Sequence, residues 1–459
     1  MEPVTPVRTF ALLAGPVLAV LLGLWVGSAA SPAAGWTAGI TLLCAVWWIF
    51  EPVPIPVTSL IPLAAFPMAG ILTPAQVGDS YGNQLILLLL GGFILSRAME
   101  QSGAHRRLAL NMVGLFGGSG GRPLVFGFML ASAVLSMWIS NTATTLMLLP
   151  IVLAVLEKSN DPLLRRALLL GVAYAASVGG IGTPIGTPPN LIFMEVYGET
   201  TGNQPTFLEW MAMGLPVVVI LVPVLGLWLT RRLGRAESLE LPEVGHWRPE
   251  EVRTLVVFGC TALAWMTLRE PFGGWSQLLG VPAASNASVA LLAVVVMFLV
   301  PNGRGGRLLT WDKAVTIPWG ALILFGGGIA IAKAFVASGL SEILGNQMVV
   351  LQQFHPLVLT LLLCLSVTFL TEITSNTATT ALLMPILAAA GTAAGIDPIL
   401  LMVPAAMTAS CAFMLPVATA PNAVVFSSNQ VTIREMAREG FVLNLLGVTV
   451  VAVVCYFTL

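Results

Sequence analysis

Apolar stretches separated by short polar connections run along almost the whole chain. They occupy residues 10–28, 36–50, 54–72, 84–101, 123–139, 146–157, 167–182, 187–197, 211–230, 254–268, 287–300, 317–337, 356–371, 378–391, 398–416, 421–428 and 441–458. A helix needs about 20 apolar residues to span a bilayer, so several of these stretches are too short to span it. The short ones form adjacent pairs, which are 123–139 with 146–157, 167–182 with 187–197, 356–371 with 378–391, and 398–416 with 421–428.

Each pair is interrupted by small polar residues, Pro or Gly. In a membrane, such irregular backbone occurs only where it is buried in protein or lines a cavity. We therefore predict an all-α polytopic membrane protein with about 11 transmembrane helices, two re-entrant hairpins and two broken helices. The hairpins are expected at 123–157 and 356–391.

Two copies of one unit follow each other along the chain. The hexapeptide Ser-Asn-Thr-Ala-Thr-Thr occupies residues 140–145 and recurs at 375–380. Further on, Thr-Pro-Pro-Asn at 187–190 has a counterpart, Thr-Ala-Pro-Asn, at 419–422. Because the matches keep their order and nearly constant spacing, we predict an internal repeat with copies at roughly 82–198 and 317–428.

The composition excludes a soluble globular protein. Apolar residues make up 57% of the chain and charged residues only 9%, whereas soluble domains carry roughly 25% charged residues. A net charge of −1 provides no basic field for nucleic acid. The five cysteines lie in apolar stretches without Cys-x-x-Cys spacing, so we interpret them as core residues rather than disulfides or metal ligands.

Positive charge predicts the topology. Lys and Arg cluster in a few short connections, which the positive-inside rule assigns to the cytoplasm. The base of the first hairpin is basic, with Lys158, Arg165 and Arg166, whereas the base of the second has no Lys or Arg. We expect the hairpins to open to opposite sides of a cell membrane, with a cytoplasmic N-terminus and an outer C-terminus. The two copies would then be inverted, as in secondary transporters.

The hairpin tips carry the candidate chemistry. Ser, Asn and Thr cap helix N-termini efficiently, and each hexapeptide opens the second arm of a hairpin. The sequences Thr187-Pro188 and Thr419-Ala420-Pro421 are typical of an N-cap followed by a first-turn proline. Four helix N-termini are therefore expected to face one cavity near the bilayer midplane and to attract an anion.

An anion in a dry site also needs positive charge, which the apolar segments almost lack. Arg97 and its repeat mate Lys333 lie near segment ends, where snorkelling explains them. We therefore expect co-bound cations held by neutral oxygens, which hard ions such as Na⁺ prefer. The candidate ligands are Ser136, Ser140, Asn141 and the Gly186 carbonyl in the first copy, and Thr371, Thr374, Asn376 and the Ala418 carbonyl in the second. Glu372 is either a structural cap or a third cation ligand.

The paired motifs resemble those of the divalent anion/sodium symporter family, the INDY-type dicarboxylate transporters. The resemblance covers nearly the whole chain. It implies a homodimer with scaffold and mobile transport domains, an elevator movement, a Na⁺ site at each tip, and a C4-dicarboxylate such as succinate, malate or fumarate between the tips. By the same resemblance, the substrate-binding residues are Asn141, Thr142, Thr187, Pro188, Asn376, Thr377, Thr419 and Ala420. Ala420 stands where a proline is common, which leaves the choice among dicarboxylates, citrate and sulfate open.

The predicted domains alternate along the chain. Scaffold helices occupy 1–122, a first transport part 123–198, scaffold and linking helices 199–355, and a second transport part 356–459. The expected partners are a small dicarboxylate, Na⁺, the lipid bilayer and a second copy of the chain, with no organic cofactor.

Na⁺-coupled dicarboxylate symport is the predicted function. The alternatives are a dicarboxylate exchanger, a transporter of another anion on the same fold, a channel, and a membrane-embedded enzyme. In the family that the motifs resemble, exchangers tend to place basic residues at the cation sites. Neither tip has such a residue, so the resemblance favours symport over exchange. An enzyme with Ser140 as nucleophile is disfavoured because no His or Lys lies near either motif to activate a serine.

Overall fold

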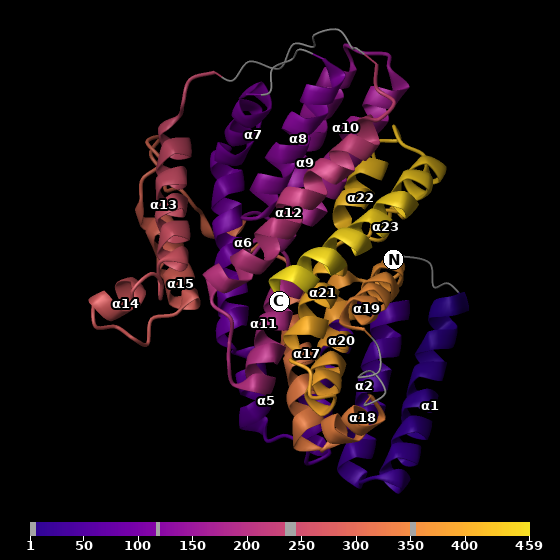
Figure 1. The fold of residues 1–459 in the computed structure, drawn as a ribbon. Helices are drawn as coiled ribbons and strands as arrows, with labels where there is room; N and C mark the ends of the chain where they lie inside the picture. The colour runs from indigo at the N-terminus through magenta and orange to yellow at the C-terminus, as the bar shows by residue number, and fades with distance from the viewer. Residues whose placement is uncertain (1–5, 116–119, 235–244, 349–354) are drawn as a thin grey trace.

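The computed structural model describes residues 6–115, 120–234, 245–348 and 355–459, and this part of the chain is built from helices (Figure 1). Seven helical runs within it are long and apolar enough to cross a membrane, as expected for an integral membrane protein. They are α1 (Pro6–Ala29), α2 (Pro32–Phe50), the run Pro74–Ser102 that contains α5 (Pro74–Tyr81) and α6 (Gln84–Ser102), the run Pro162–Gly182 that begins with α10 (Pro162–Gly179), α12 (Phe207–Thr230), α17 (Trp319–Ala337) and α23 (Ile433–Thr458).

The short apolar stretches form shorter helices, as the sequence predicts. The two hairpins consist of α8 (Gly121–Ser136) with α9 (Asn141–Leu156), and α19 (Pro356–Thr371) with α20 (Asn376–Ala393). The first broken helix consists of α10, the 3₁₀ turn η1 (Gly180–Gly182) and α11 (Pro188–Thr201). The second consists of α21 (Ile399–Thr408) and α22 (Ala420–Phe426). Both breaks therefore fall immediately before the repeated Thr-x-Pro-Asn motifs.

Some boundaries differ from the prediction. The stretch 398–416 is not one helix, because α21 ends at Thr408 and residues 409–419 are irregular. Partners outside the helix satisfy this irregular backbone. The N–H groups of Met414 and Leu415 donate to Glu372, and the N–H group of Phe413 donates to Asn444. The stretch 54–72 likewise divides, into α3 (Ile55–Thr58) and α4 (Ile61–Met68).

Further helices connect these elements. They are α7 (Ala104–Leu115), α13 (Pro249–Met266), α14 (Gly274–Leu278), α15 (Asn286–Leu299), α16 (Trp311–Ala314) and α18 (Leu340–Met348). Figure 1 places α7 to α10 and α12 in the upper part of the molecule, α1, α2 and α18 in the lower part, and α13 to α15 as a projection beside α6. The first hairpin thus lies above the second in this view.

The packing of α12 groups it with the hairpin helices. It packs against α8, α10 and α23, whereas α13 packs against α6, α7 and α15. At the end of α12, Arg231 stacks on Trp228 and pairs with Glu439 of α23 at 2.9 Å. The predicted domain division assigned α12 to the linking region, but its packing partners are helices of the two predicted transport parts.

The end of the connection that follows α12 is attached to α7. The Arg107 guanidinium donates to the carbonyl oxygens of Gly245 and His246 and to the carboxylate of Glu251, at 2.6–2.7 Å. Burial alone would raise the pKa of Glu251, but the hydrogen bond and positive charge of Arg107 hold that pKa below its usual range. This contact fixes the start of α13 beside α7.

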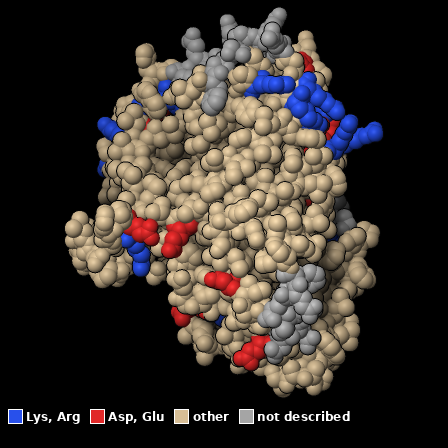
Figure 2. Space-filling view, viewed as in Figure 1, with Lys and Arg blue, Asp and Glu red and all other residues tan. Residues whose placement is uncertain are grey.

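The surface of the molecule is strongly apolar. Large side chains such as Phe10, Trp25 and Leu227 are 64–71% exposed, as expected for helices that face lipid. Figure 2 shows Lys and Arg gathered along the upper rim and Asp and Glu across the middle and lower face. All five cysteines are free, and four are buried; Cys260 on α13 is exposed, which corrects its interpretation as a core residue.

Candidate functional site

Both hairpin tips and both helix breaks line one cavity of about 450 Å³. The structure thus brings all eight predicted substrate-binding residues together, namely Asn141, Thr142, Thr187, Pro188, Asn376, Thr377, Thr419 and Ala420. Of the predicted cation ligands, Ser140, Asn141, Gly186, Thr374, Asn376 and Ala418 also line this cavity, whereas Ser136 and Thr371 lie behind the tips and are fully buried. Segments more than 200 residues apart in the sequence therefore share one wall.

At the first tip, hydroxyl groups hold the chain turn. Ser140 is the N-cap of α9, and its side chain accepts a hydrogen bond from the Ala143 N–H at 3.2 Å. The Ser136 hydroxyl lies 2.5 Å from Asn141 Oδ1 and 2.6 Å from the Ala176 carbonyl oxygen of α10. The amide oxygen of Asn141 is thereby fixed beside the first broken helix.

The second tip repeats this geometry with different residues. Ser375 caps α20, and the Thr371 hydroxyl lies 2.5 Å from Asn376 Oδ1 and 3.1 Å from the Ala409 carbonyl oxygen. Thr374 also belongs to this tip. Its hydroxyl lies 2.8 Å from the Leu370 carbonyl oxygen and 2.6 Å from Thr379 Oγ1, so it already has partners within the hairpin.

Glu372 anchors the second broken helix. Its carboxylate accepts hydrogen bonds from the N–H groups of Met414 and Leu415 at 2.9 and 3.0 Å, and from the Asn444 amide at 2.7 Å. The side chain is buried, with 3% exposure, and it does not line the cavity. The sequence left two roles open for Glu372, a structural cap or a third cation ligand. These contacts correspond to the structural role, and the segment that Glu372 caps is the second helix break rather than the hairpin.

An asparagine that was not predicted as a site residue holds the irregular backbone of each break by hydrogen bonds. The Asn190 amide donates to the carbonyl oxygens of Gly180 and Thr183 at 2.9 and 2.7 Å. The Asn422 amide donates to those of Ala412 and Leu415 at 3.1 and 3.0 Å. The repeated final Asn of the two tetrapeptides was the available signal for these residues.

The four helix starts at the cavity are not equivalent. Thr419 caps α22 by accepting from the Asn422 N–H at 3.2 Å, whereas the Thr187 side chain makes no capping hydrogen bond to α11 within the described residues. Prolines occupy the first turn of both helices, as predicted. An anion in this cavity would meet N–H groups from both copies, because helix N-termini carry partial positive charge.

Residues outside the hairpins and the helix breaks complete the wall. Glu51, Phe93 and Pro318 line the cavity, and none of them was predicted. Glu51 ends α2 with a left-handed backbone conformation, at φ 47°. A carboxylate on this wall favours cations in the cavity and disfavours a lone anion.

A second cavity of about 650 Å³ adjoins the first, since Ser140, Thr142 and Pro318 line both. Its other polar lining residues are Arg97, Glu100, His105 and Arg106, so its lining carries more positive than negative charge. Arg97 is paired with Glu100 at 2.6 Å, and its repeat mate Lys333 is paired with Glu199 of α11 at 3.4 Å. Both predicted snorkelling residues are therefore ion-paired near helix ends.

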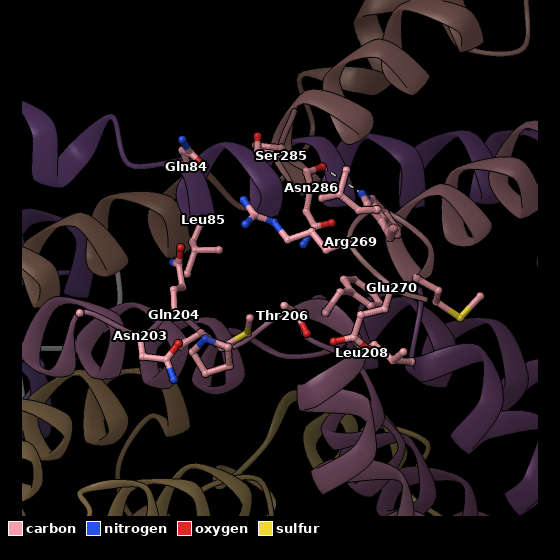
Figure 3. Close-up of a pocket in the computed structure, with 18 residues that line it drawn as sticks. Gln84, Leu85, Asn203, Gln204, Thr206, Leu208, Arg269, Glu270, Ser285 and Asn286 are labelled. Atoms are coloured by element: carbon pink, nitrogen blue, oxygen red, sulfur yellow. Dashed lines mark hydrogen bonds between the residues drawn. The ribbon is translucent and has the colours of Figure 1, made fainter. Parts of the chain in front are cut away.

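A third cavity, of about 310 Å³, lies apart from both tips (Figure 3). It is enclosed by residues 202–208, by residues 268–270 and by the starts of α6 and α15. Figure 3 shows the Arg269 guanidinium extending into it, toward Leu85. No residue of either hexapeptide lines it, so the repeated motifs single out the first cavity as the candidate site.

The amino-acid sequence matches the model of the citrate transporter family over residues 45–402. The sodium-dependent dicarboxylate transporter SdcS of Staphylococcus saprophyticus is 39% identical to the chain, with 97% of this chain and 90% of that protein aligned. The Staphylococcus aureus protein of the same name is 37% identical, with 100% and 92% aligned.

Two solved transporter structures share the fold. The Alcanivorax borkumensis YdaH transporter superposes with a TM-score of 0.61 at 19% identity, covering 91% of this chain and 98% of that chain. Neisseria gonorrhoeae MtrF, from a class of antimetabolite efflux pumps, superposes with a TM-score of 0.57 at 15% identity, covering 83% and 82%. At such identities, the likeness concerns the fold alone.

Proposed function

The chain belongs to the citrate transporter family, and from this membership we propose that it carries C4-dicarboxylates across a membrane by Na⁺-coupled symport. The names of its relatives, which are sodium-dependent dicarboxylate transporters at 37–39% identity over nearly the whole chain, support both the ion and the substrate class. Family and relatives are transporters, so the enzyme alternative is set aside.

The shared cavity is the observation that carries the proposal. A volume of about 450 Å³ accommodates a four-carbon dianion, and the two tips offer hydrogen-bond donors from opposite copies. In the proposed pose, Asn141 and Thr142 bind one carboxylate and Asn376 and Thr377 bind the other. Thr187, Pro188, Thr419 and Ala420 close the sides of the site.

Na⁺ would neutralise the dianion at each tip. Asn141 Oδ1 and the Gly186 carbonyl oxygen approach the same side of Gly180, because a Cβ added there would lie 2.8 and 3.2 Å from them. With Ser136 and Ser140, they form the proposed first cation site. Thr371, Thr374, Asn376 and the Ala418 carbonyl form the second. A loaded site then approaches neutrality, which lowers the cost of crossing the apolar barrier.

We propose that transport proceeds by an elevator movement. The hairpins, the broken helices, α12 and α23 would move as one unit against a scaffold of α1 to α7 and α13 to α18, within a homodimer. The candidate cavity adjoins the basic second cavity, and the positive-inside rule assigns basic surfaces to the cytoplasm. The proposed orientation has a cytoplasmic N-terminus and an outer C-terminus, and it makes this conformation inward-facing.

Uptake of labelled succinate into proteoliposomes tests the proposal. We expect uptake driven by an inward Na⁺ gradient and abolished when choline replaces Na⁺. Asn141→Ala and Asn376→Ala should each reduce uptake by about tenfold or more, because each removes hydrogen bonds to a charged group. Asn203→Ala, at the third cavity, is the matched control and should transport normally.

The same assay separates the alternatives. Saturable succinate uptake that is unaffected by choline but stimulated by internal succinate would replace symport with exchange. Uptake of labelled citrate or sulfate, with succinate ignored, would move the substrate class while leaving the site in place. The family model is that of citrate transporters, so citrate is the first other anion to test.

A further inference from the structure

Two buried asparagines at matching places of the two breaks have incomplete hydrogen bonding. Asn190 and Asn422 are both fully buried. The amide oxygen of each makes no hydrogen bond with any residue in the described part of the chain. Buried polar atoms are nearly always satisfied, so one without a protein partner points to a bound water or ion.

The orientation of both amides is fixed. Each Nδ2 donates to two carbonyl oxygens at once, from Gly180 and Thr183 in the first copy and from Ala412 and Leu415 in the second. Rotating either amide by 180° would set its oxygen against two carbonyl oxygens. The unpartnered atom is therefore the oxygen, an acceptor that only a donor or a cation satisfies.

A serine near the end of the preceding helix has the same deficiency in each copy, although the two serines are one place out of register between the copies. Ser177 lies in the last turn of α10, and Ser410 lies two residues beyond the end of α21. Both are buried, with 1% and 0% exposure, and neither hydroxyl oxygen makes a hydrogen bond within the described residues. Each unwound segment is thus bordered by one unpartnered hydroxyl and one unpartnered amide oxygen.

The Asn190 amide and the tip oxygens contact different atoms of Gly180. In the first copy, the Cβ position of Gly180 faces Asn141 Oδ1 and the Gly186 carbonyl oxygen, whereas the Gly180 carbonyl is bonded to Asn190. The unwound segment therefore runs between the proposed tip cation site and the Asn190 amide. A ligand of Asn190 would occupy a position different from that of a ligand of Asn141.

We propose that each unwound segment holds a further monovalent cation behind the hairpin tip. Its ligands include Ser177 Oγ and Asn190 Oδ1 in the first copy and Ser410 Oγ and Asn422 Oδ1 in the second. Neutral amide and hydroxyl oxygens without a carboxylate suit a singly charged hard cation. The inference rests on the proposed function for the identity of the ion, Na⁺, and it adds coupling ions to those at the tips.

Thermal unfolding of the purified full-length protein tests this without any dicarboxylate. The midpoint is measured against NaCl, with choline chloride keeping the ionic strength constant, for the wild type, Ser177→Ala, Ser410→Ala and the double variant. A cation that binds only the folded protein raises the midpoint with its concentration. In the absence of Na⁺, the variants should be at least as stable as the wild type, because each loses a buried hydroxyl without a partner.

With Na⁺ present, we expect half-maximal stabilisation of each single variant at about fivefold higher Na⁺ than for the wild type, as for the loss of one ligand interaction. The double variant should need more. Thr254→Val is the matched control, since Thr254 is a fully buried threonine of α13 whose hydroxyl also lacks a partner among the described residues. Its Na⁺ response should equal that of the wild type.

Two results would overturn the proposal. Serine variants that respond to Na⁺ as the wild type does would assign the unpartnered oxygens to buried water, and a wild type that Na⁺ does not stabilise would remove the sites altogether. Failure of Na⁺-driven succinate uptake would instead refute the proposed function, and the unfolding titration would still report on these sites.

Discussion

At the first hairpin tip residue 137 is a methionine, and the equivalent place at the second tip is taken by Glu372. The Met137 carbonyl accepts the Thr183 hydroxyl, and its side chain lies against Gly182. Glu372 instead accepts two backbone N–H groups and the Asn444 amide. Identical hexapeptides therefore face one cavity while two unrelated supports hold them there, one neutral and packed, the other charged and hydrogen-bonded.

The two breaks also differ in the residues that support them, although both border the same cavity. The first break keeps Gly at 179, 180 and 182, where the chain turns in a short 3₁₀ helix against α8. The second break has Cys411, Ala412 and Met414 at the corresponding places, and its backbone is held by Glu372, which follows α19, and by Asn444 of α23. Both copies therefore contain a broken helix, but glycines allow the break in the first copy and long-range hydrogen bonds stabilise it in the second.

The largest difference in stability is expected when the support of each tip is removed in turn. Glu372→Ala leaves three donors without an acceptor in a buried site, so we expect the free energy of unfolding to fall by about 3–5 kcal/mol. Met137→Ala removes only part-buried packing and should cost about 2 kcal/mol or less. Denaturant unfolding in detergent without Na⁺ measures both. Equal losses would mean that the supports are equivalent after all.

Exchanging the hydroxyls behind the tips sharpens the comparison. Ser136→Ala and Thr371→Val each remove the group that holds an Asn amide oxygen, so each should raise the Na⁺ concentration for half-maximal uptake about fivefold. Ser136→Thr and Thr371→Ser keep the hydroxyl and should stay near the wild type. An effect confined to one tip would show that only that copy binds a coupling ion.

The smallest effect is expected where the two tetrapeptides differ. Ala420 is the first residue of α22, and its N–H makes no hydrogen bond among the described residues. Ala420→Pro should therefore raise the free energy of unfolding by about 0.4–1 kcal/mol, by restricting the unfolded chain. Thermal unfolding measures this change, and Pro188→Ala in the first copy is the reciprocal test. Destabilisation by Ala420→Pro would mean that the second break requires a backbone angle closed to proline.

The sequence predicted what is local. The hexapeptides, the tetrapeptides and the apolar periodicity placed both hairpins and both breaks within a few residues, because caps and first-turn prolines act on their own helix. The convergence of the tips followed from the repeat and not from the residues of either tip alone. The roles of the tip residues in binding remain predictions.

What the sequence could not predict depends on distant contacts. The end of α21 at Thr408 depends on Glu372 and Asn444, which lie far from it along the chain. Glu372 alone could serve either as a cap or as a cation ligand, and only its partners decide between them. The packing of α12 with the hairpin helices likewise rests on contacts with α8 and α23 that no local pattern encodes.

The shared wall of the cavity also bears on how such a chain changes over generations. Residues 140–142 and 375–377 line the same cavity, so a substitution at any of them alters the space that both copies share. Met137 and Glu372 each support one tip only, and the two residues differ. The two copies are therefore alike at the hairpin residues that line the cavity and different at the residues that support each tip alone.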